Sequence, residues 1–153
     1  MKIALGADHA GFDLKQDLVS FVESLGHEAA DVGTISRDPV DYPDFAQAVA
    51  LAVLGGGADR GVLICGSGVG ASVAANKVSG IRAGLCHDTY SAHQGVEHDN
   101  MNILVMGARV IGEELAHELV RTYLRAHFTD EARHRRRLEK IAEMEKRYSF
   151  GAR

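Results

Sequence analysis

The sequence predicts an α/β fold, a three-layer α/β/α sandwich in which a five-stranded parallel sheet lies between two layers of helices. Five short apolar runs are typical of buried strands, and segments with helical periodicity separate them. Glycines end several of these segments, as they do at strand and helix boundaries. Because we find no internal repeat, low-complexity tract or linker, we expect a single domain over residues 1–153.

The first half of the chain is expected to contain two strands and two helices. They are a strand at 2–6, a helix at 12–25, a weaker strand at 27–33, a loop at 34–45, and a helix from 45 to the glycines at 55–57. The first strand is apolar and ends in Gly6, and Gly26 is a suitable C-terminal stop for the first helix. The loop contains both prolines of the chain, Pro39 and Pro43.

The second half repeats the alternation of strands and helices. We expect strands at 60–66, 81–88 and 102–107, and helices at 69–77, from 89 to 97, around 115–123, and at 130–148. The last of these helices is highly charged and has only a thin apolar stripe of Leu138, Ile141 and Met144. We therefore expect it to pack on a partner subunit as well as on its own core.

Composition and charge restrict the classes of function. Apolar residues make up 46% and charged residues 25% of the 153 residues, as in ordinary globular proteins. The formal net charge of −4 argues against general binding to nucleic acid or anionic membranes, so an anionic substrate needs a local cluster of positive charge. No apolar run approaches the roughly 20 residues of a membrane span. The N-terminus lacks a secretory pattern and the two cysteines lack disulfide spacing, so we expect a cytoplasmic protein.

The most informative stretch is VLICGSGVGASVAANK, residues 62–77, in which Cys65 ends a strand and a glycine-rich turn follows. From Gly66 to Ala71 this turn matches the dinucleotide pattern G-x-G-x-x-A, and Asp88 lies near the distance of a ribose-binding acid. However, the pattern follows the third strand rather than the first, and Asp88 belongs to a polar cluster. Both points weaken the dinucleotide interpretation.

The same turn can instead hold an oxyanion. Its backbone N–H groups point into one small volume at the start of a helix, and the hydroxyl of Ser67 is a further donor. Such a site stabilises a thiolate at Cys65, which could then act in catalysis. The alternative is that Cys65 is a small core residue, the usual place of a free cysteine, and this is our interpretation of Cys86.

Histidines and arginines supply the other candidates. His9 and His98 each stand beside an acid at an element boundary, where a histidine can be oriented for proton transfer. No HExxH motif or Cys/His quartet is present, so we expect no metal site. Arg133 and Arg137 are one helical turn apart and suit a phosphate, unless they form a solvated basic face. Arg109 follows the fifth strand at the expected ligand edge.

Taken together, the motifs resemble those of the type B ribose-5-phosphate isomerases, which belong to the sugar-phosphate isomerases. The matching segments, from Lys2 to about Glu145, are ADHAG, DYPDFA, ICGSGVGASVAANK, GIRAG, EHDNMN, GARVIG and ARHRRRLEKI. The resemblance implies a Rossmann- or flavodoxin-like sandwich and isomerisation through an enediolate without metal or cofactor. It also implies a homodimer, or a dimer of dimers, in which both subunits complete each site. The base would be Cys65, because the branch without this cysteine has a glutamate at the position of Ala71.

The resemblance further implies a role for each site residue. The anion hole for the enediolate oxygens would comprise Gly66, Ser67, Gly68, Val69 and Gly70. His98 would assist opening of the sugar ring, and Asp8 would contact sugar hydroxyls. The phosphate would be bound by His9, Arg109, Arg133 and Arg137. One position departs from the pattern, because many members have asparagine where this chain has Asp99. A carboxylate there disfavours a neighbouring enediolate, so Asn100 is expected to take the donor role.

We therefore expect an isomerase of phosphorylated sugars that interconverts ribose 5-phosphate and ribulose 5-phosphate. Because of Asp99, a tetrose 4-phosphate such as erythrulose 4-phosphate, or a hexose 6-phosphate, is an alternative substrate. Two other classes stay open at this point. They are a nicotinamide-dependent oxidoreductase that uses the glycine motif and a non-catalytic sensor of phosphosugars.

Overall fold

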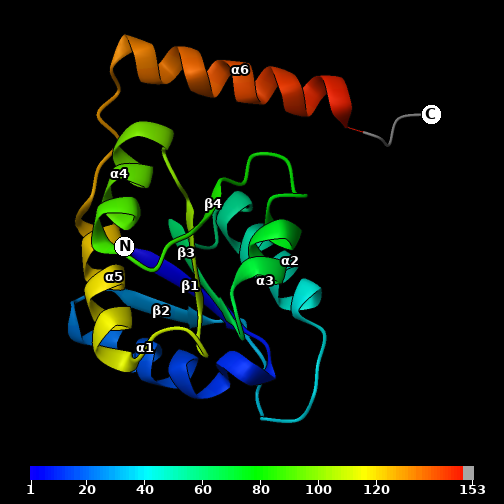
Figure 1. Cartoon of the computed structure of the whole chain (residues 1–153), viewed down its shortest axis with the longest axis vertical. Helices are drawn as coiled ribbons and strands as arrows, with labels where there is room; N and C mark the ends of the chain where they lie inside the picture. Colours follow the sequence, from blue (N-terminus) through cyan, green and yellow to red (C-terminus); the bar gives the residue numbers. More distant parts are fainter. Residues whose placement is uncertain (150–153) are drawn as a thin grey trace.

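The computed structural model describes residues 1–149 and contains the expected sandwich (Figure 1). Residues 150–153, the end of the expected domain, lie outside the described residues. Five parallel strands form one sheet in the order β2-β1-β3-β5-β4. These strands are β1 (Lys2–Ala7), β2 (Glu28–Asp31), β3 (Arg60–Cys65), β4 (Ala83–Leu85) and β5 (Ile103–Gly107).

Helices cover both faces of the sheet. One face carries α1 (Phe12–Ser24), α4 (Thr89–Asp99) and α5 (Glu113–Arg125), and the other carries α2 (Tyr42–Leu54) and α3 (Val69–Ala75). Successive side chains of a strand alternate between the two resulting cores. In β3, Val62 and Ile64 belong to the core under α1, whereas Leu63 and Cys65 belong to the core under α2 and α3.

The order of the strands differs in one respect from the flavodoxin order 2-1-3-4-5. Here β5 lies between β3 and β4, so β4 forms an edge of the sheet. The side chain of Asn76 covers part of this edge, because it accepts a hydrogen bond from the Ala83 N–H and donates one to the Ala83 carbonyl, both at 2.9 Å. The expected layers are thus confirmed, with the last two strands exchanged.

Several helix boundaries differ from the prediction by a few residues, and two of them bear on the position of site residues. α2 begins at Tyr42 rather than at residue 45, because Pro43 occupies the first turn, where its missing N–H leaves no helical bond unmade. α4 continues beyond residue 97 to Asp99 and is capped by Asn100 in the left-handed conformation, with φ of 47°. His98 therefore lies on the last turn of a helix.

The C-terminal helix α6 (Ala132–Tyr148) crosses one end of the molecule, and His134 is its single buried residue (Figure 1). The Glu145 carboxylate accepts a hydrogen bond from the Gly80 N–H at 3.1 Å and ties the far end of the helix to the body. Ile141 and Met144 of the apolar stripe stay 41% and 59% exposed. Packing of this stripe on a partner subunit stays a prediction. Among residues 1–149, no helix combines the length and apolarity that crossing a membrane requires.

Candidate active site

The glycine turn after β3 is fixed by both backbone conformation and close packing. Gly68 has φ of 83°, in the left-handed region that favours glycine. A Cβ atom at this position would lie 2.5 Å from Cδ1 of Leu85 and 3.0 Å from the Met106 carbonyl carbon. Gly107 of β5 packs equally closely, since a Cβ atom there would lie 2.5 Å from the Ser67 carbonyl oxygen. The sequence therefore holds this turn in one shape against the neighbouring strand.

Cys65 is brought to the start of this turn with its sulfur beside a backbone donor. The N–H of Gly68 donates to Sγ of Cys65 at 3.1 Å. Cys65 as a residue is 4% exposed, and it belongs to the core under α2 and α3. A backbone N–H directed at sulfur stabilises negative charge there, which is what a thiolate base requires.

The turn after β1 brings Asp8 and His9 to the same edge of the sheet. The Asp8 carboxylate accepts hydrogen bonds from the N–H groups of Ala10 and Gly11 at 3.0 and 3.1 Å, and it is 6% exposed. Nδ1 of His9 accepts from the Val40 N–H at 3.2 Å, so the neutral ring carries its proton on Nε2. Asp8 thus orders the turn that presents His9.

The turn after β5 adds Arg109 to this group. Its backbone N–H donates to the Gly66 carbonyl at 2.9 Å, and a Cβ atom on Gly66 would lie 3.5 Å from Nη1 of Arg109. The exposed guanidinium therefore lies over the glycine turn and supplies positive charge there. Asp8, His9, Cys65, the glycine turn and Arg109 together form what we call the thiol cluster.

Sequence reasoning assigned no role to two further residues of this edge. The Tyr42 ring packs against Gly70, where a Cβ atom would lie 2.6 Å from Cζ of the tyrosine. Nε2 of His87 accepts from the Gly107 N–H at 2.9 Å and fixes the strand end that packs on Ser67. His87 lies two residues beyond the carboxyl end of β4, and Tyr42 belongs to the matching segment DYPDFA, to which no role was assigned.

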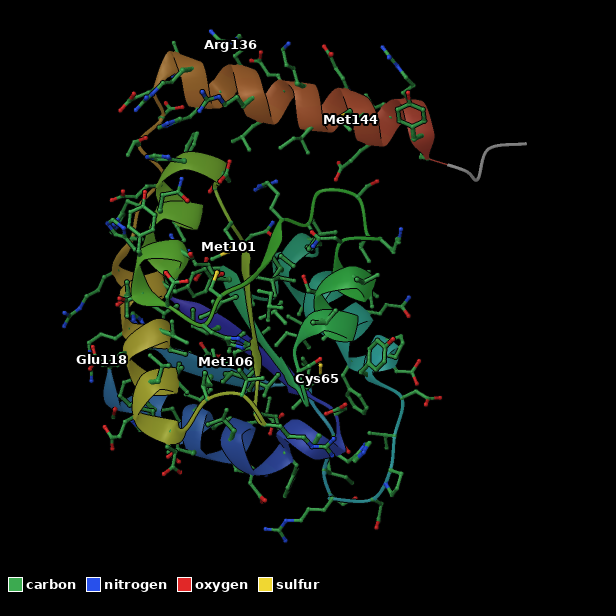
Figure 2. The ribbon with its side chains drawn as sticks, in the orientation of Figure 1. Cys65, Met101, Met106, Glu118, Arg136 and Met144 are labelled. Carbon is green, nitrogen blue, oxygen red and sulfur yellow. The ribbon has the colours of Figure 1, made fainter. Side chains whose placement is uncertain are left out.

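The remaining expected site residues lie at the opposite end of the strands, near their amino ends. α4 starts beside the carboxyl end of β4 and returns to the amino edge, where β5 begins at Ile103. Cys65 pairs with Gly107 at the other end of β5. Gly107 lies four residues beyond Ile103, which corresponds to about 13 Å of strand. Figure 2 shows this separation, with Cys65 far from α6 and its Arg136. One protomer therefore does not bring His98, Asp99, Asn100, Arg133 and Arg137 to Cys65.

These five residues form a second group, the histidine–arginine cluster, around the junction of α4 and α6. Nδ1 of His98 accepts a hydrogen bond from the Gln94 side-chain amide at 2.8 Å, so the proton of the neutral ring is on Nε2. Arg133 and Arg137 are exposed, and Nε of Arg133 donates to Glu131 at 2.8 Å. Asp99 is exposed as well.

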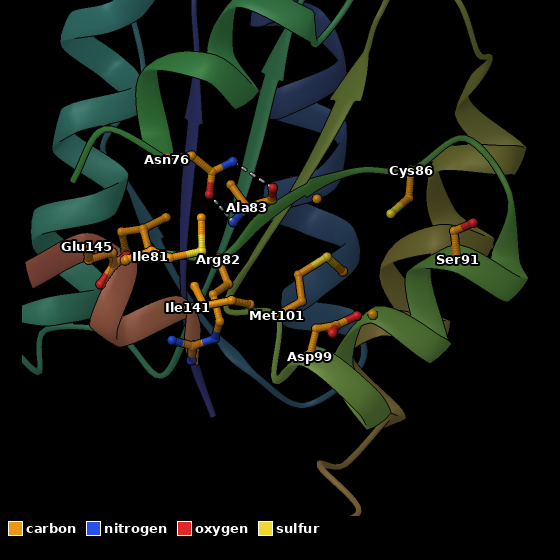
Figure 3. Close-up of a pocket in the computed structure, with 13 residues that line it drawn as sticks. Asn76, Ile81, Arg82, Ala83, Cys86, Ser91, Asp99, Met101, Ile141 and Glu145 are labelled. Atoms are coloured by element: carbon orange, nitrogen blue, oxygen red, sulfur yellow. Dashed lines mark hydrogen bonds between the residues drawn. The ribbon is translucent and has the colours of Figure 1, made fainter. Parts of the chain in front are cut away.

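A groove of about 530 Å³ separates α6 from β4 and α4 (Figure 3). Asp99 and Cys86 line it, together with the apolar side chains of Met101, Ile141 and Met144. Burial raises the pKa of the Cys86 thiol to about 11, which agrees with its interpretation as a core residue. No group of three or more possible metal-ligating side chains is found between residues 1 and 149.

Asp88, the acid of the dinucleotide interpretation, has a structural task. Its carboxylate accepts a hydrogen bond from the Ser91 N–H at 2.7 Å and caps the N-terminus of α4. This hydrogen bond is the main reason that the pKa of Asp88 is lowered. The geometry therefore gives no support to Asp88 as a ribose-binding acid.

Comparison with known proteins places the whole chain. A family model described as Ribose/Galactose Isomerase matches residues 3–141. Ribose-5-phosphate isomerase B of Escherichia coli is 48% identical over 146 residues, which cover 95% of this chain and 97% of that protein. D-erythrulose-4-phosphate isomerase of Pectobacterium atrosepticum is 43% identical, with 84% and 85% of the two chains covered.

Solved structures agree with this assignment. Ribose-5-phosphate isomerase B of Clostridium thermocellum superposes with a TM-score of 0.95 at 49% identity, and the match covers 97% of this chain and all of that one. The enzyme of Mycoplasma genitalium, solved with bound ribulose 5-phosphate, gives a TM-score of 0.88 at 36% identity over 95% and 96% of the chains. The expected resemblance is confirmed: the chain belongs to the ribose/galactose isomerase family and is similar over nearly its full length to type B ribose-5-phosphate isomerases.

Proposed function

We propose that this chain is an aldose–ketose isomerase that interconverts ribose 5-phosphate and ribulose 5-phosphate, with Cys65 as the base. Membership of the family and the bound ribulose 5-phosphate of one relative support the substrate class. The observation that carries the assignment of the base is the Gly68 N–H directed at Sγ of Cys65 at 3.1 Å.

The proposed chemistry moves one proton between neighbouring carbons. The Cys65 thiolate takes the proton from C2 of the open-chain aldose, and the electrons of the C–H bond pass to the C1 carbonyl to form an enediolate. The thiol then returns the proton to C1, while a proton moves from the oxygen on C2 to the oxygen on C1. The backbone N–H groups from Gly66 to Gly70 and the Ser67 hydroxyl would hold the enediolate oxygens, in the manner of an oxyanion hole.

We propose further that each complete site combines two protomers. Ring opening and proton abstraction act on adjacent carbons of one sugar, so His98 and Cys65 must approach the same molecule, yet they lie at opposite ends of the strands. A second copy related by a two-fold axis would place its histidine–arginine cluster beside the thiol cluster of the first. The first copy would do the same for the second, which gives two equal sites. The exposed Val69 and Val73, which begin α3 next to the glycine turn, suit such an interface.

The substrate phosphate would then lie between positive groups of both protomers. His9 and Arg109 would come from the thiol cluster, and Arg133 and Arg137 from the histidine–arginine cluster. Because the chain as a whole is negative, this local concentration of cations would provide the attraction for an anionic sugar. Remote binding through a phosphate that does not react would orient the reacting carbons.

Asp99 bears on the choice of sugar. Its exposed carboxylate stands where asparagine was expected from the family pattern, and Asn100 follows in the left-handed conformation. A relative that acts on erythrulose 4-phosphate keeps a tetrose as the alternative substrate. Assaying tetrose, pentose and hexose phosphates side by side tests this, with ribose 5-phosphate expected to give the highest kcat/KM. We place the enzyme in the cytoplasm, where phosphosugars are metabolised.

Replacement of Cys65 by alanine tests the proposed base. We expect Cys65→Ala to abolish turnover and the wash-in of solvent deuterium at C1 of ribulose 5-phosphate, while the affinity for substrate is kept. Cys86→Ala is the matched control, because it removes a thiol that faces the groove and leaves the turn intact. Persisting deuterium exchange in Cys65→Ala would reject the thiol as base. Binding without exchange in the unaltered protein would instead indicate a sensor, and a nicotinamide fluorescence titration would detect an oxidoreductase.

A further inference from the structure

His134 is a buried histidine without a role in the proposed chemistry. It lies on the first turn of α6 and is fully buried. This end of α6 lies next to α4 (Figure 1). The ring of His134 stacks on the ring of His98, with centroids 4.3 Å apart and an angle of 26° between the planes. The Phe128 ring is tilted by 45° to the His134 ring, with centroids 6.5 Å apart. His134 is thus in direct contact with the residue proposed to open the sugar ring.

A chain of hydrogen bonds determines which nitrogen of His134 carries the proton. The Thr129 hydroxyl donates to the Glu97 carbonyl at 3.0 Å, so it must accept from Nδ1 of His134, which lies 2.8 Å away. The backbone N–H of Thr129 donates to the same carbonyl at 3.1 Å and fixes the hydroxyl in place. Thr129 therefore connects the ring of His134 to the last turn of α4.

The other nitrogen of His134 favours the neutral ring. Nε2 is buried and meets no hydrogen-bonding partner within residues 1–149. A proton there would create a buried, unpaired N–H group and a buried charge. Burial lowers the pKa of His134, the positive charges of His98, Arg133 and Arg137 lower it further, and the Glu131 carboxylate opposes them.

His98 has the opposite surroundings. It is half-buried, and its Nδ1 is occupied by the Gln94 amide. One face of its ring is covered by His134. With Nδ1 occupied by Gln94 and one ring face covered, Nε2 is the nitrogen of His98 left to exchange a proton with a ligand.

We infer that His134 is a positioning residue for His98, whose ring it holds in one plane by stacking on it. This inference rests on the proposed function. It predicts that loss of the ring at position 134 impairs the ring-opening step and spares the enediolate chemistry at Cys65. A ring of similar shape should keep most of the effect, because stacking rather than proton transfer by His134 provides it.

Two variants and two substrates test the inference. Ribose 5-phosphate closes into a furanose, whereas ribulose 5-phosphate is acyclic because its O5 carries the phosphate. We expect His134→Ala to lower kcat for ribose 5-phosphate by about 10- to 100-fold, with KM changed less than threefold, as for a misplaced proton-transfer group. We expect His134→Phe to retain at least about a third of kcat, because the phenyl ring still stacks.

The isotope readout separates positioning from general damage. In both variants, deuterium exchange at C1 of ribulose 5-phosphate should proceed within about twofold of the unaltered rate, because this acyclic ketose needs no ring opening. Equal losses of exchange and of ribose 5-phosphate turnover, or an unchanged kcat in His134→Ala, would overturn the inference. Thr129→Val provides a second route if His134→Ala does not fold, and it should reduce kcat in the same selective way. Absence of exchange in the unaltered protein would reject the proposed function instead.

Discussion

If Cys65 of one protomer acts together with His98 of its partner, two inactive variants should restore each other. The first variant, Cys65→Ala, disables the thiol cluster, and the second, His98→Asn, disables the histidine–arginine cluster. Cys65 lies at the carboxyl end of β3 and His98 on the last turn of α4, at the opposite end of the strands, so neither change is expected to disturb the packing around the other.

The expected activities follow from counting sites in a two-fold dimer. In a heterodimer of the two variants, one site receives the intact Cys65 and the intact His98, and the other receives both substitutions. The activity should be about half that of the unaltered dimer. In a heterodimer of the unaltered chain with the double variant, each site contains one substitution, so the activity should be close to zero. A site contained within one protomer gives the reverse result, close to zero for the first heterodimer and about half for the second.

Co-expression with two different affinity tags, followed by two purification steps, isolates each heterodimer. Conversion of ribose 5-phosphate to ribulose 5-phosphate is then measured per dimer, with both homodimeric variants as blanks. Activity of the double-variant heterodimer at half the unaltered level would refute the shared site. Failure to recover any heterodimer, together with a monomeric mass in light scattering, would refute the dimer itself.

Further predictions concern single residues of both clusters. Gly68→Ala should lower the melting temperature and abolish turnover, because the residue has a positive φ and its Cβ would meet Leu85 at 2.5 Å. Arg133→Ala should raise KM with little change in kcat and weaken inhibition by inorganic phosphate; an unchanged KM would contradict phosphate binding. Alkylation of Cys86 should accelerate as pH rises toward about 11, where its thiolate forms. For His134, whose folded-state pKa is lowered, the unfolded chain takes up the proton first as pH falls. Acidification below about pH 6.5 should therefore lower the melting temperature of the unaltered protein more than that of His134→Phe.

Local patterns in the sequence identified what local chemistry determines. The apolar runs gave all five strands, and the turn from Cys65 to Gly70 was identified because a left-handed conformation and close packing both require glycine. The position of β5 between β3 and β4 could not be predicted, since pairing depends on contacts between segments distant in the chain. The start of α2 was misplaced because Pro43 was interpreted as a loop residue rather than as part of a first helical turn.

His134 shows why one site residue was overlooked. It lies within the run RHRRR, whose charge suggests a solvated surface. Its spacing contains the opposite signal, because Leu138 and Ile141 follow at four and seven residues, on the same face of α6. The burial of this face near His134 depends on the C-terminal end of α4, which the sequence alone does not bring there.

The connectivity of the fold explains why the two clusters are apart. In a parallel sheet the chain leaves each strand at the carboxyl edge and must return to the amino edge before the next strand begins, so the last turn of α4 is carried away from Cys65. A group on a returning helix can therefore meet the loops at the strand ends only across a boundary between subunits. If each site is assembled in this way, the isolated protomer folds but lacks a complete site. Dilution below the dissociation constant of the dimer should then abolish turnover while far-UV circular dichroism stays unchanged.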